Sequence, residues 1–360
     1  MTTRNSTVDI AKGLGILLVV FGHNWIVSHE QGELFRVIFS FHMPLFFFLS
    51  GVFLKESDSV ERFLTTRADS LLKPFFVTLA TLGALKLLIA ITNGKATEPN
   101  FDYILGMIWA TGPTIAWVPL WFLPHLFLAL GFALILVKTI NFGAEKLLLA
   151  LFLLTINLSV GIFFIDAFWY PNPNNSTVIG FDNLPGLPWS IDLVLVTSSF
   201  ICFGYLFRNW VKGMTFNSLG LLISISCFIW LHFEFDETID FNSRIYGNYL
   251  ISTLQAVVGI YITICLASYL QKSPMFRNAL AYIGEGSLFI LIFHGVLQAK
   301  CFSMLASMDT NLYVSGAVSF LLAISISLVF REITTRSRLL SVLLLPMSGR
   351  KHRAEITAVG

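Results

Sequence analysis

The sequence predicts an all-α, polytopic transmembrane helix bundle, and three observations lead to this fold class. Hydrophobic residues make up 56% of the 360 residues and charged residues only 12%, whereas a soluble domain has about 25% charged residues. The mean hydropathy is +0.77. Long apolar stretches recur along the whole chain, separated by polar segments. A soluble fold of this length cannot hide so much apolar surface, so we expect lipid to be the solvent for most of it.

A helix that crosses the hydrocarbon core needs about 20 mostly apolar residues, and about ten stretches meet this requirement. They are residues 8–27, 35–54, 72–92, 115–137, 146–166, 191–207, 217–233, 248–269, 280–299 and 312–330. A further stretch, 101–112, is too short to cross and is expected in the membrane interface. No small-residue cleavage site follows the first stretch, so we interpret it as a retained span rather than a secretory signal.

The distribution of Lys and Arg predicts the orientation of the spans. If the N-terminus is cytoplasmic, most of the 23 Lys and Arg residues fall in cytoplasmic segments, as the positive-inside rule requires. An even number of spans then places the C-terminus on the same side. We therefore expect a transmembrane domain over residues 1–335 and a basic cytoplasmic tail over 336–360.

The first span carries a pair of ionisable residues, Lys12 and His23. Ionisable groups inside a span are expensive and are functional candidates by default. Their spacing is close to three helical turns, which places both on one face, about 16 Å apart along the axis. Asp9 lies one turn before Lys12 and is positioned to pair with it. The alternative interpretation is that Lys12 extends to the headgroups and His23 only ends the span.

Three further spans contain histidines in polar surroundings. His42 lies two residues before a proline, which predicts a kink or broken turn nearby. Trp121 and His125 lie near the start of the fourth span, in the segment WVPLWFLPHLFLAL. The ninth span carries Glu285 near its cytoplasmic start and His294 deeper in. One buried histidine is readily structural, but histidines on four spans together favour a site.

The segments expected outside have a different composition. Residues 166–190 contain no Lys or Arg and are rich in Pro, Asn, Gly and aromatic residues. They fit either an ordinary surface loop or a carbohydrate-facing loop. Residues 234–240 form an acidic patch that we expect to be merely solvated. The four cysteines lie far apart without metal-binding spacing, so no metal site is predicted.

Two of these segments resemble the membrane acyltransferase-3 family. DIAKGLGILLVVFGH, from Asp9 to His23, resembles the family's opening, in which ten residues separate a basic residue from a histidine. FHMPLFFFLSG, from Phe41 to Gly51, resembles a second landmark, and WFLPHLFLA and GEGSLFILIFH resemble two later ones. The resemblance covers essentially the whole chain. It is closest to the fucose 4-O-acetylase-like branch, whose members O-acetylate polysaccharide and nodulation-factor sugars.

The resemblance implies a multi-pass O-acyltransferase of the bacterial inner membrane. Its acyl donor is cytoplasmic acetyl-CoA, its acceptor is a hydroxyl of a lipid-linked or polymeric saccharide, and it needs neither a metal nor nucleic acid. His23 acts as a general base or as a transient acyl carrier, and the sequence does not separate the two. The expected site comprises catalytic His23, His294 and Glu285, donor-binding Lys12, Arg62, Arg67 and Lys73, and substrate-binding Asp9, Asn24, His42, Trp121 and His125.

One departure and two alternatives accompany this interpretation. Family members often carry an RxxR pair after the second span, whereas this chain has Arg67 followed by Ser70, with Lys73 as the nearest replacement. The loop also fits the positive-inside signal alone. A transporter or flippase for a lipid-linked saccharide is the main alternative, although no inverted repeat is visible. A non-catalytic receptor or scaffold would leave the spacing of Lys12 and His23 without a reason.

Overall fold

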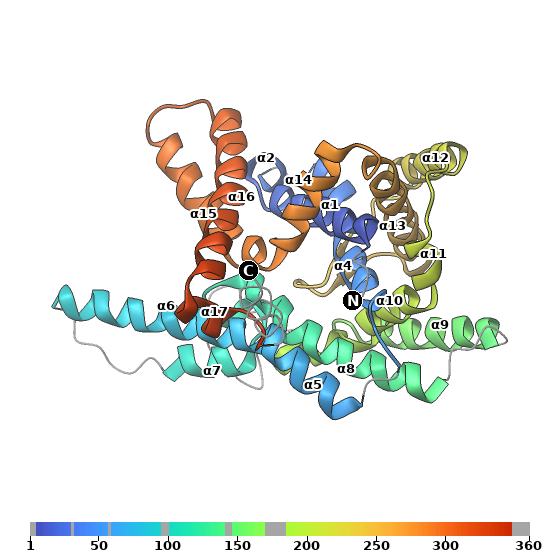
Figure 1. The fold of residues 1–360 in the computed structure, drawn as a ribbon, viewed down its shortest axis with the longest axis horizontal. Coiled ribbons are helices and arrows are strands. Elements are labelled where there is room, and N and C mark those ends of the chain that lie inside the picture. The colour runs from blue at the N-terminus through green and yellow to red at the C-terminus, as the bar shows by residue number, and fades with distance from the viewer. Residues whose placement is uncertain are drawn as a thin grey trace, which may run out of the picture.

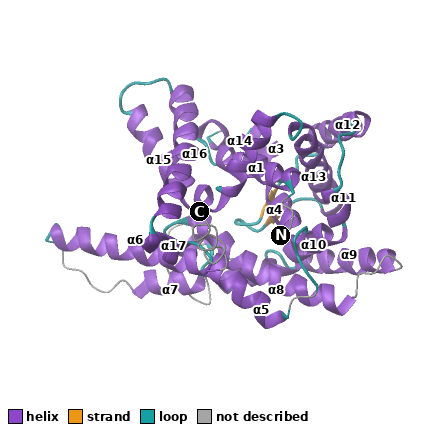
Figure 2. Cartoon of the chain, in the orientation of Figure 1, coloured by secondary structure: helices purple, strands orange, loops and turns teal. Residues whose placement is uncertain are grey.

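A computed structural model describes residues 5–29, 32–56, 59–94, 101–140, 146–169 and 185–347, and these residues are almost entirely helical (Figures 1 and 2). A single two-stranded hairpin is set among the helices of this part of the chain. Its strands are β1 (Ile239–Asp240) and β2 (Ile245–Tyr246), which pair antiparallel. The arrangement is that of the helical membrane protein predicted from hydropathy.

The helices follow the predicted apolar stretches in chain order. They are α1 (Ser6–Gly22), α2 (Trp25–Ser28), α3 (Glu33–Phe39), α4 (His42–Gly51), α5 (Val60–Arg67), α6 (Lys73–Thr92), α7 (Phe101–Trp109), α8 (Phe122–Ile140), α9 (Leu147–Phe163), α10 (Val194–Leu206), α11 (Arg208–Lys212), α12 (Ser218–Glu234), α13 (Tyr249–Leu270), α14 (Pro274–Glu285), α15 (Ser287–Ala306), α16 (Leu312–Arg336) and α17 (Arg338–Leu344). A π-helical turn, Ala68–Leu72, joins α5 to α6, and 3₁₀ turns occupy Gly112–Thr114, Val118–Trp121 and Pro188–Leu193.

Seven helical segments among the described residues are long and apolar enough to cross a membrane. They are Glu33–Gly51, Val60–Thr92, Val118–Ile140, Pro188–Leu206, Tyr249–Leu270, Ser287–Ala306 and Leu312–Arg336. Helices α9 and α12 are apolar but have only 17 residues each, and α1 is equally short. Helix length therefore does not confirm the expected number of about ten spans.

Three predicted spans contain breaks that hydropathy does not reveal. The expected break near His42 lies immediately before it, between α3 and α4. The first span ends as a helix at Gly22, and the Asn24 side chain caps α2. The prediction of one helix over 280–299 is wrong, because α14 and α15 meet at Gly286. A Cβ at Gly286 would lie 2.4 Å from a Leu328 methyl, so α16 packs closely against this break.

Helix α1 lies inside the bundle, packed by α14, α13, α15 and α4 (Figure 1). Its contact with α14 is made backbone to backbone, because a Cβ on Gly13 would lie 2.2 Å from the Leu280 carbonyl oxygen and one on Gly284 would lie 2.2 Å from that of Asp9. Small residues allow such close approach between helices in lipid. In contrast, α9 exposes Leu148 and other large apolar side chains, as a lipid-facing helix does.

The predicted C-terminal tail begins as ordered structure. Helix α17 packs against α6, and Lys73 Nζ donates a hydrogen bond of 2.6 Å to the Leu345 carbonyl. Asp69 accepts from the Met347 amide at 2.5 Å. Residues 348–360 lie outside the described part of the chain. Residues 170–184, which belong to the loop that fits a carbohydrate-facing role, also lie outside it.

We expect Gly204→Val to destabilise the bundle. Helices α4 and α10 meet at Gly51 and Gly204, whose Cβ atoms would lie 1.8 Å from the carbonyl oxygens of Ile201 and Phe48. Overpacking at such a contact costs about 1–3 kcal/mol or more, so the melting temperature in detergent should fall. Gly32→Ala is the control, since nothing lies within 4 Å of its Cβ position. Equal melting temperatures for both variants would contradict the glycine contact.

Candidate active site

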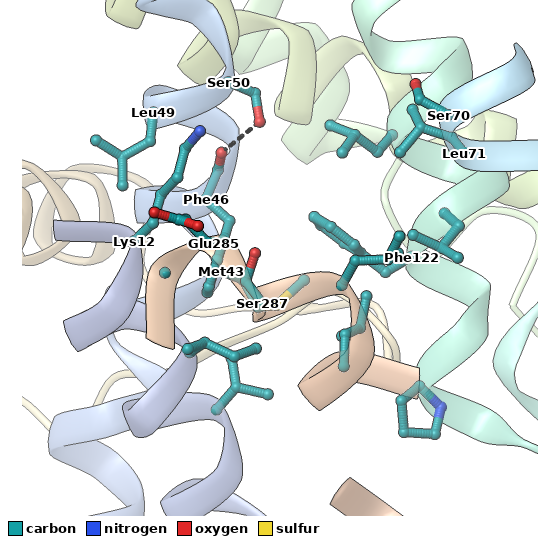
Figure 3. A pocket seen from close by; sticks show the side chains of 18 of the residues that line it. Lys12, Met43, Phe46, Leu49, Ser50, Ser70, Leu71, Phe122, Glu285 and Ser287 are labelled. Atoms are coloured by element: carbon teal, nitrogen blue, oxygen red, sulfur yellow. Dashed lines mark hydrogen bonds between the residues drawn. The ribbon is translucent and has the colours of Figure 1, made fainter. Parts of the chain in front are cut away.

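A cavity of about 560 Å³ opens along α1 from Lys12 to His23, and we call it the Lys12 pocket (Figure 3). Figure 3 shows Lys12, Leu49 and Glu285 on one side and Leu71 and Phe122 across the cavity. The pocket is lined by Asp9, Lys12, Ile16, Val19, His23, Met43, Phe46, Leu49, Ser50, Ser70, Leu71, Pro119, Trp121, Phe122, Leu123, Leu126, Gly284, Glu285, Ser287, Leu288, Leu291 and Pro346. The helical stripe predicted for Lys12 and His23 therefore faces a cavity rather than lipid.

Charged side chains gather at the Lys12 end of this pocket. Lys12 lies over the ring of Phe53 at 4.9 Å, and Lys212 approaches the same ring at 5.4 Å. Glu285 forms an ion pair of 2.7 Å with Arg331 of α16. The interior beyond is mostly apolar. The pocket thus combines a charged mouth, lined by Asp9, Lys12 and Glu285, with an apolar channel that leads to a histidine.

A second cavity of about 330 Å³ lies on the other side of His23 and reaches the β1–β2 hairpin, so we call it the hairpin pocket. It is lined by His23, Phe39, His42, Met43, Ala116, Trp117, Val118, Pro119, Trp121, Asp240, Asn242, Gly295 and Val296. Four residues line both cavities, namely His23, Met43, Pro119 and Trp121. His23 follows the last residue of α1, inside the bundle. Its side chain is nevertheless exposed, because both cavities open onto it.

His294 lies beside His23, with ring centroids 5.5 Å apart and ring planes 32° apart. Its Nδ1 is 2.8 Å from the Ile290 carbonyl oxygen, which only accepts, so Nδ1 carries the proton and Nε2 presents a lone pair. Nε2 is buried and has no partner among the described residues. His42 is fixed in the same way by the Ile38 carbonyl. The rings are thus held in defined tautomers around the accessible His23.

Asn24 and His125 lie apart from both cavities. Asn24 is fully buried and donates to Gln298 Oε1 at 2.7 Å and to the Gly316 carbonyl at 2.9 Å. Both ring nitrogens of His125 have partners, the Trp189 carbonyl at 3.3 Å and the Thr197 hydroxyl at 3.0 Å. These two side chains tie helices together and leave no group directed at a substrate.

The cations expected to bind the donor in the loop after the second span do not line the Lys12 pocket. Arg62 is exposed on α5, and Arg67 lies over the Phe63 ring at 5.1 Å. Lys73 is paired with Asp69 at 2.5 Å. This segment reaches the pocket only through Ser70 and Leu71 of the π-helical turn. Lys212, which the sequence analysis did not select, lies over the same Phe53 ring as Lys12.

Sequence reasoning also missed Asp240 and Asn242, which the hairpin brings to the pocket that contains His23. The acidic segment 234–240 was expected to be merely solvated, and this is wrong for Asp240. Its neighbour Arg244 was the available signal, because an arginine on the side expected to be external opposes the positive-inside trend. Within the described residues, no group of three His, Cys, Asp or Glu side chains is placed to hold a metal ion.

A bundle of apolar helices around an accessible histidine with a cavity on each side defines a membrane-embedded protein built for a reaction between two ligands. Residues 5–331 match the family model of the acyltransferase domain known as acyltransferase-3. The chain belongs to this family and is a membrane acyltransferase. Neither the curated proteins nor the solved structures with which it was compared match it.

We expect His125→Ala and His23→Ala to differ in stability. His125 is fully buried with both nitrogens bonded, so its loss should lower the free energy of unfolding by about 2–4 kcal/mol. His23 faces cavities, and its replacement should stay within about 0.5 kcal/mol of the parent. Thermal unfolding in detergent measures both. A large loss for His23→Ala would show that this ring holds the fold together.

Proposed function

We propose that the protein is an O-acetyltransferase of the bacterial inner membrane, which transfers the acetyl group of cytoplasmic acetyl-CoA to a hydroxyl of a cell-surface or exopolysaccharide glycan. The observation that carries the proposal is the position of His23 at the junction of two cavities. One cavity begins among charged side chains that include Lys12, and the other begins at the hairpin that carries Asp240. A transferase with two unlike substrates needs such a junction. The family match does not support a transporter.

The Lys12 pocket suits coenzyme A, whose phosphates are anionic and whose pantetheine arm is long and narrow. Lys12 and Lys212, which share the Phe53 ring, would attract the phosphates at the mouth. The arm would lie along α1 for about 16 Å, the rise between Lys12 and His23. The volume of about 560 Å³ is in the range of small-molecule sites. The basic segments expected to be cytoplasmic favour the same entry side.

The hairpin pocket would then hold the saccharide. Trp121 and Trp117 offer aromatic faces, while Asp240 and Asn242 offer polar groups. An acceptor hydroxyl beside His23 would lie next to the thioester delivered from the other cavity. Holding both reactants in contact removes much of the entropic barrier to a bimolecular step.

In the reaction that we propose, neutral His23 takes the proton of the acceptor hydroxyl as its oxygen attacks the thioester carbonyl. The new ester bond forms, the carbon–sulfur bond breaks, and the thiolate leaves with a proton from His23. The Nε2 lone pair of His294 beside this ring would orient and stabilise the imidazolium. An acetyl-His23 intermediate is the second route that the same contacts allow.

His23→Ala should abolish transfer without preventing insertion. Loss of a general base lowers kcat by about 10²–10⁴-fold, measured as CoA release from acetyl-CoA in the presence of extracted glycan. His29→Ala is the matched control, because His29 lies just beyond α2, lines neither cavity and stacks on Trp25. Full activity in purified His23→Ala would refute the assignment.

Lys12→Met should raise the KM for acetyl-CoA about tenfold and affect kcat less. The reason is that Lys12 would bind a donor phosphate and would not take part in the chemical step. Lys138→Met, an exposed residue in the last turn of α8, provides the comparison. Initial rates over a range of acetyl-CoA concentrations distinguish the two parameters. An unchanged KM in Lys12→Met would place the phosphates elsewhere.

A further inference from the structure

The β1–β2 hairpin is shaped by the side chain of Asp240. Its carboxylate accepts the backbone N–H groups of Asn242 at 3.0 Å and Ser243 at 3.3 Å, and the Ser243 hydroxyl at 2.8 Å. Hydrogen bonds to both oxygens hold the carboxylate in one place. Asp240 therefore presents a fixed negative charge to the hairpin pocket that it lines.

A fully buried ion pair anchors the hairpin to the start of α10. Arg244 Nε is 2.8 Å from Asp192 Oδ2, and both side chains are 0% exposed. Arg244 also donates to the Ser190 hydroxyl at 3.1 Å and to the Asn242 carbonyl at 3.0 Å. Its φ of 55° is unusual for a non-glycine residue and is held by these contacts. The hairpin is thus a rigid wall of the pocket.

The net charge of this wall is negative. Asp192 neutralises Arg244 one to one, and Asp240 is the only residue with a carboxylate, ammonium or guanidinium group among those lining the hairpin pocket. Asp240 and His23 line the same cavity. Glu234, Asp236 and Glu237 precede Asp240 in the sequence but do not line the pocket, and Asp236 pairs with Arg36 at 2.7 Å.

Asn242 lines the same pocket with an unsatisfied amide. Its buried Oδ1 has no hydrogen-bond partner among the described residues. The amide packs on Gly112, where a Cβ would lie 1.9 Å from Oδ1, so the side chain cannot withdraw in that direction. A buried amide without a protein partner is costly unless a ligand or water completes its bonds.

From this wall we infer the acceptor class: the hairpin pocket selects an uncharged, hydroxyl-rich saccharide and excludes anionic sugars, with Asp240 as the residue that discriminates and Asn242 as a hydrogen-bonding partner. The inference rests on the proposed function. A carboxylate of a uronic acid would lie near the Asp240 carboxylate in low-dielectric surroundings, and like charges there repel strongly. A neutral sugar instead carries no charge to be repelled, and its hydroxyl groups can donate to Asn242 Oδ1, which has no donor among the described residues.

The test compares purified protein variants with acetyl-CoA and a panel of neutral saccharides, each paired with its uronic acid. We expect wild type to prefer the neutral member by roughly an order of magnitude in kcat/KM. Asp240→Asn keeps the shape and an acceptor oxygen, and should reduce that preference about fivefold or more, chiefly through a lower KM for the uronic acid. Asn242→Asp adds a second carboxylate and should increase the preference.

Glu234→Gln removes an exposed carboxylate from the same acidic segment, outside the pocket, and should leave the preference unchanged. Transfer to neutral and acidic acceptors with equal efficiency, or an unchanged preference in both Asp240→Asn and Asn242→Asp, overturns the inference and leaves the acyltransferase proposal standing. Absence of transfer to every saccharide overturns the proposed function and this inference together. If Glu234→Gln changes the preference as much as Asp240→Asn does, the general surface charge selects the acceptor, and the role of Asp240 is overturned.

Discussion

The close contact between α1 and α14 is the constraint on which the site depends. At Gly13 and Gly284 the two backbones touch, because a Cβ on either glycine would lie 2.2 Å from a carbonyl oxygen of the other helix. This contact keeps α1 within the bundle and places Glu285, the last residue of α14, beside Lys12 at the wall of one cavity. A helix held more loosely would turn its ionisable residues toward lipid, where they are expensive. The break at Gly286 then lets α15 bring His294 to His23.

The two cavities meet at His23, so this polar ring is not enclosed by apolar side chains inside the membrane protein. His23 is accessible, whereas the neighbouring His294 and His42 are buried and have their Nδ1 atoms bonded to main-chain carbonyls. One ring is therefore free to exchange a proton with ligands while its neighbours stay in fixed tautomers. Met43, Pro119 and Trp121 line both cavities beside this ring. This arrangement allows two ligands to meet at one ring without sharing a binding site.

Hydropathy and helical periodicity could predict the helical membrane class and the common face of Lys12 and His23, because both depend on residues close in sequence. Hydropathy does not record the break at Gly286, whereas the nearby Pro44 predicted the break before His42. Arg62, Arg67 and Lys73 do not line the Lys12 pocket, and their role in donor binding stays a prediction, while Lys212 reaches Phe53 from a distant helix. Asp240 lies in a short hairpin that a distant ion pair holds, so its segment looked like a solvated acidic loop.

The charged side chains differ between the two cavities. Lys12 and Lys212 lie around Phe53 at one end, where an anionic donor would be attracted. At the other end the Arg244 charge is cancelled by Asp192 inside the protein, and Asp240 remains as the uncancelled charge facing the pocket. The same two charge clusters would therefore separate the ligands by charge and assign each to its own cavity.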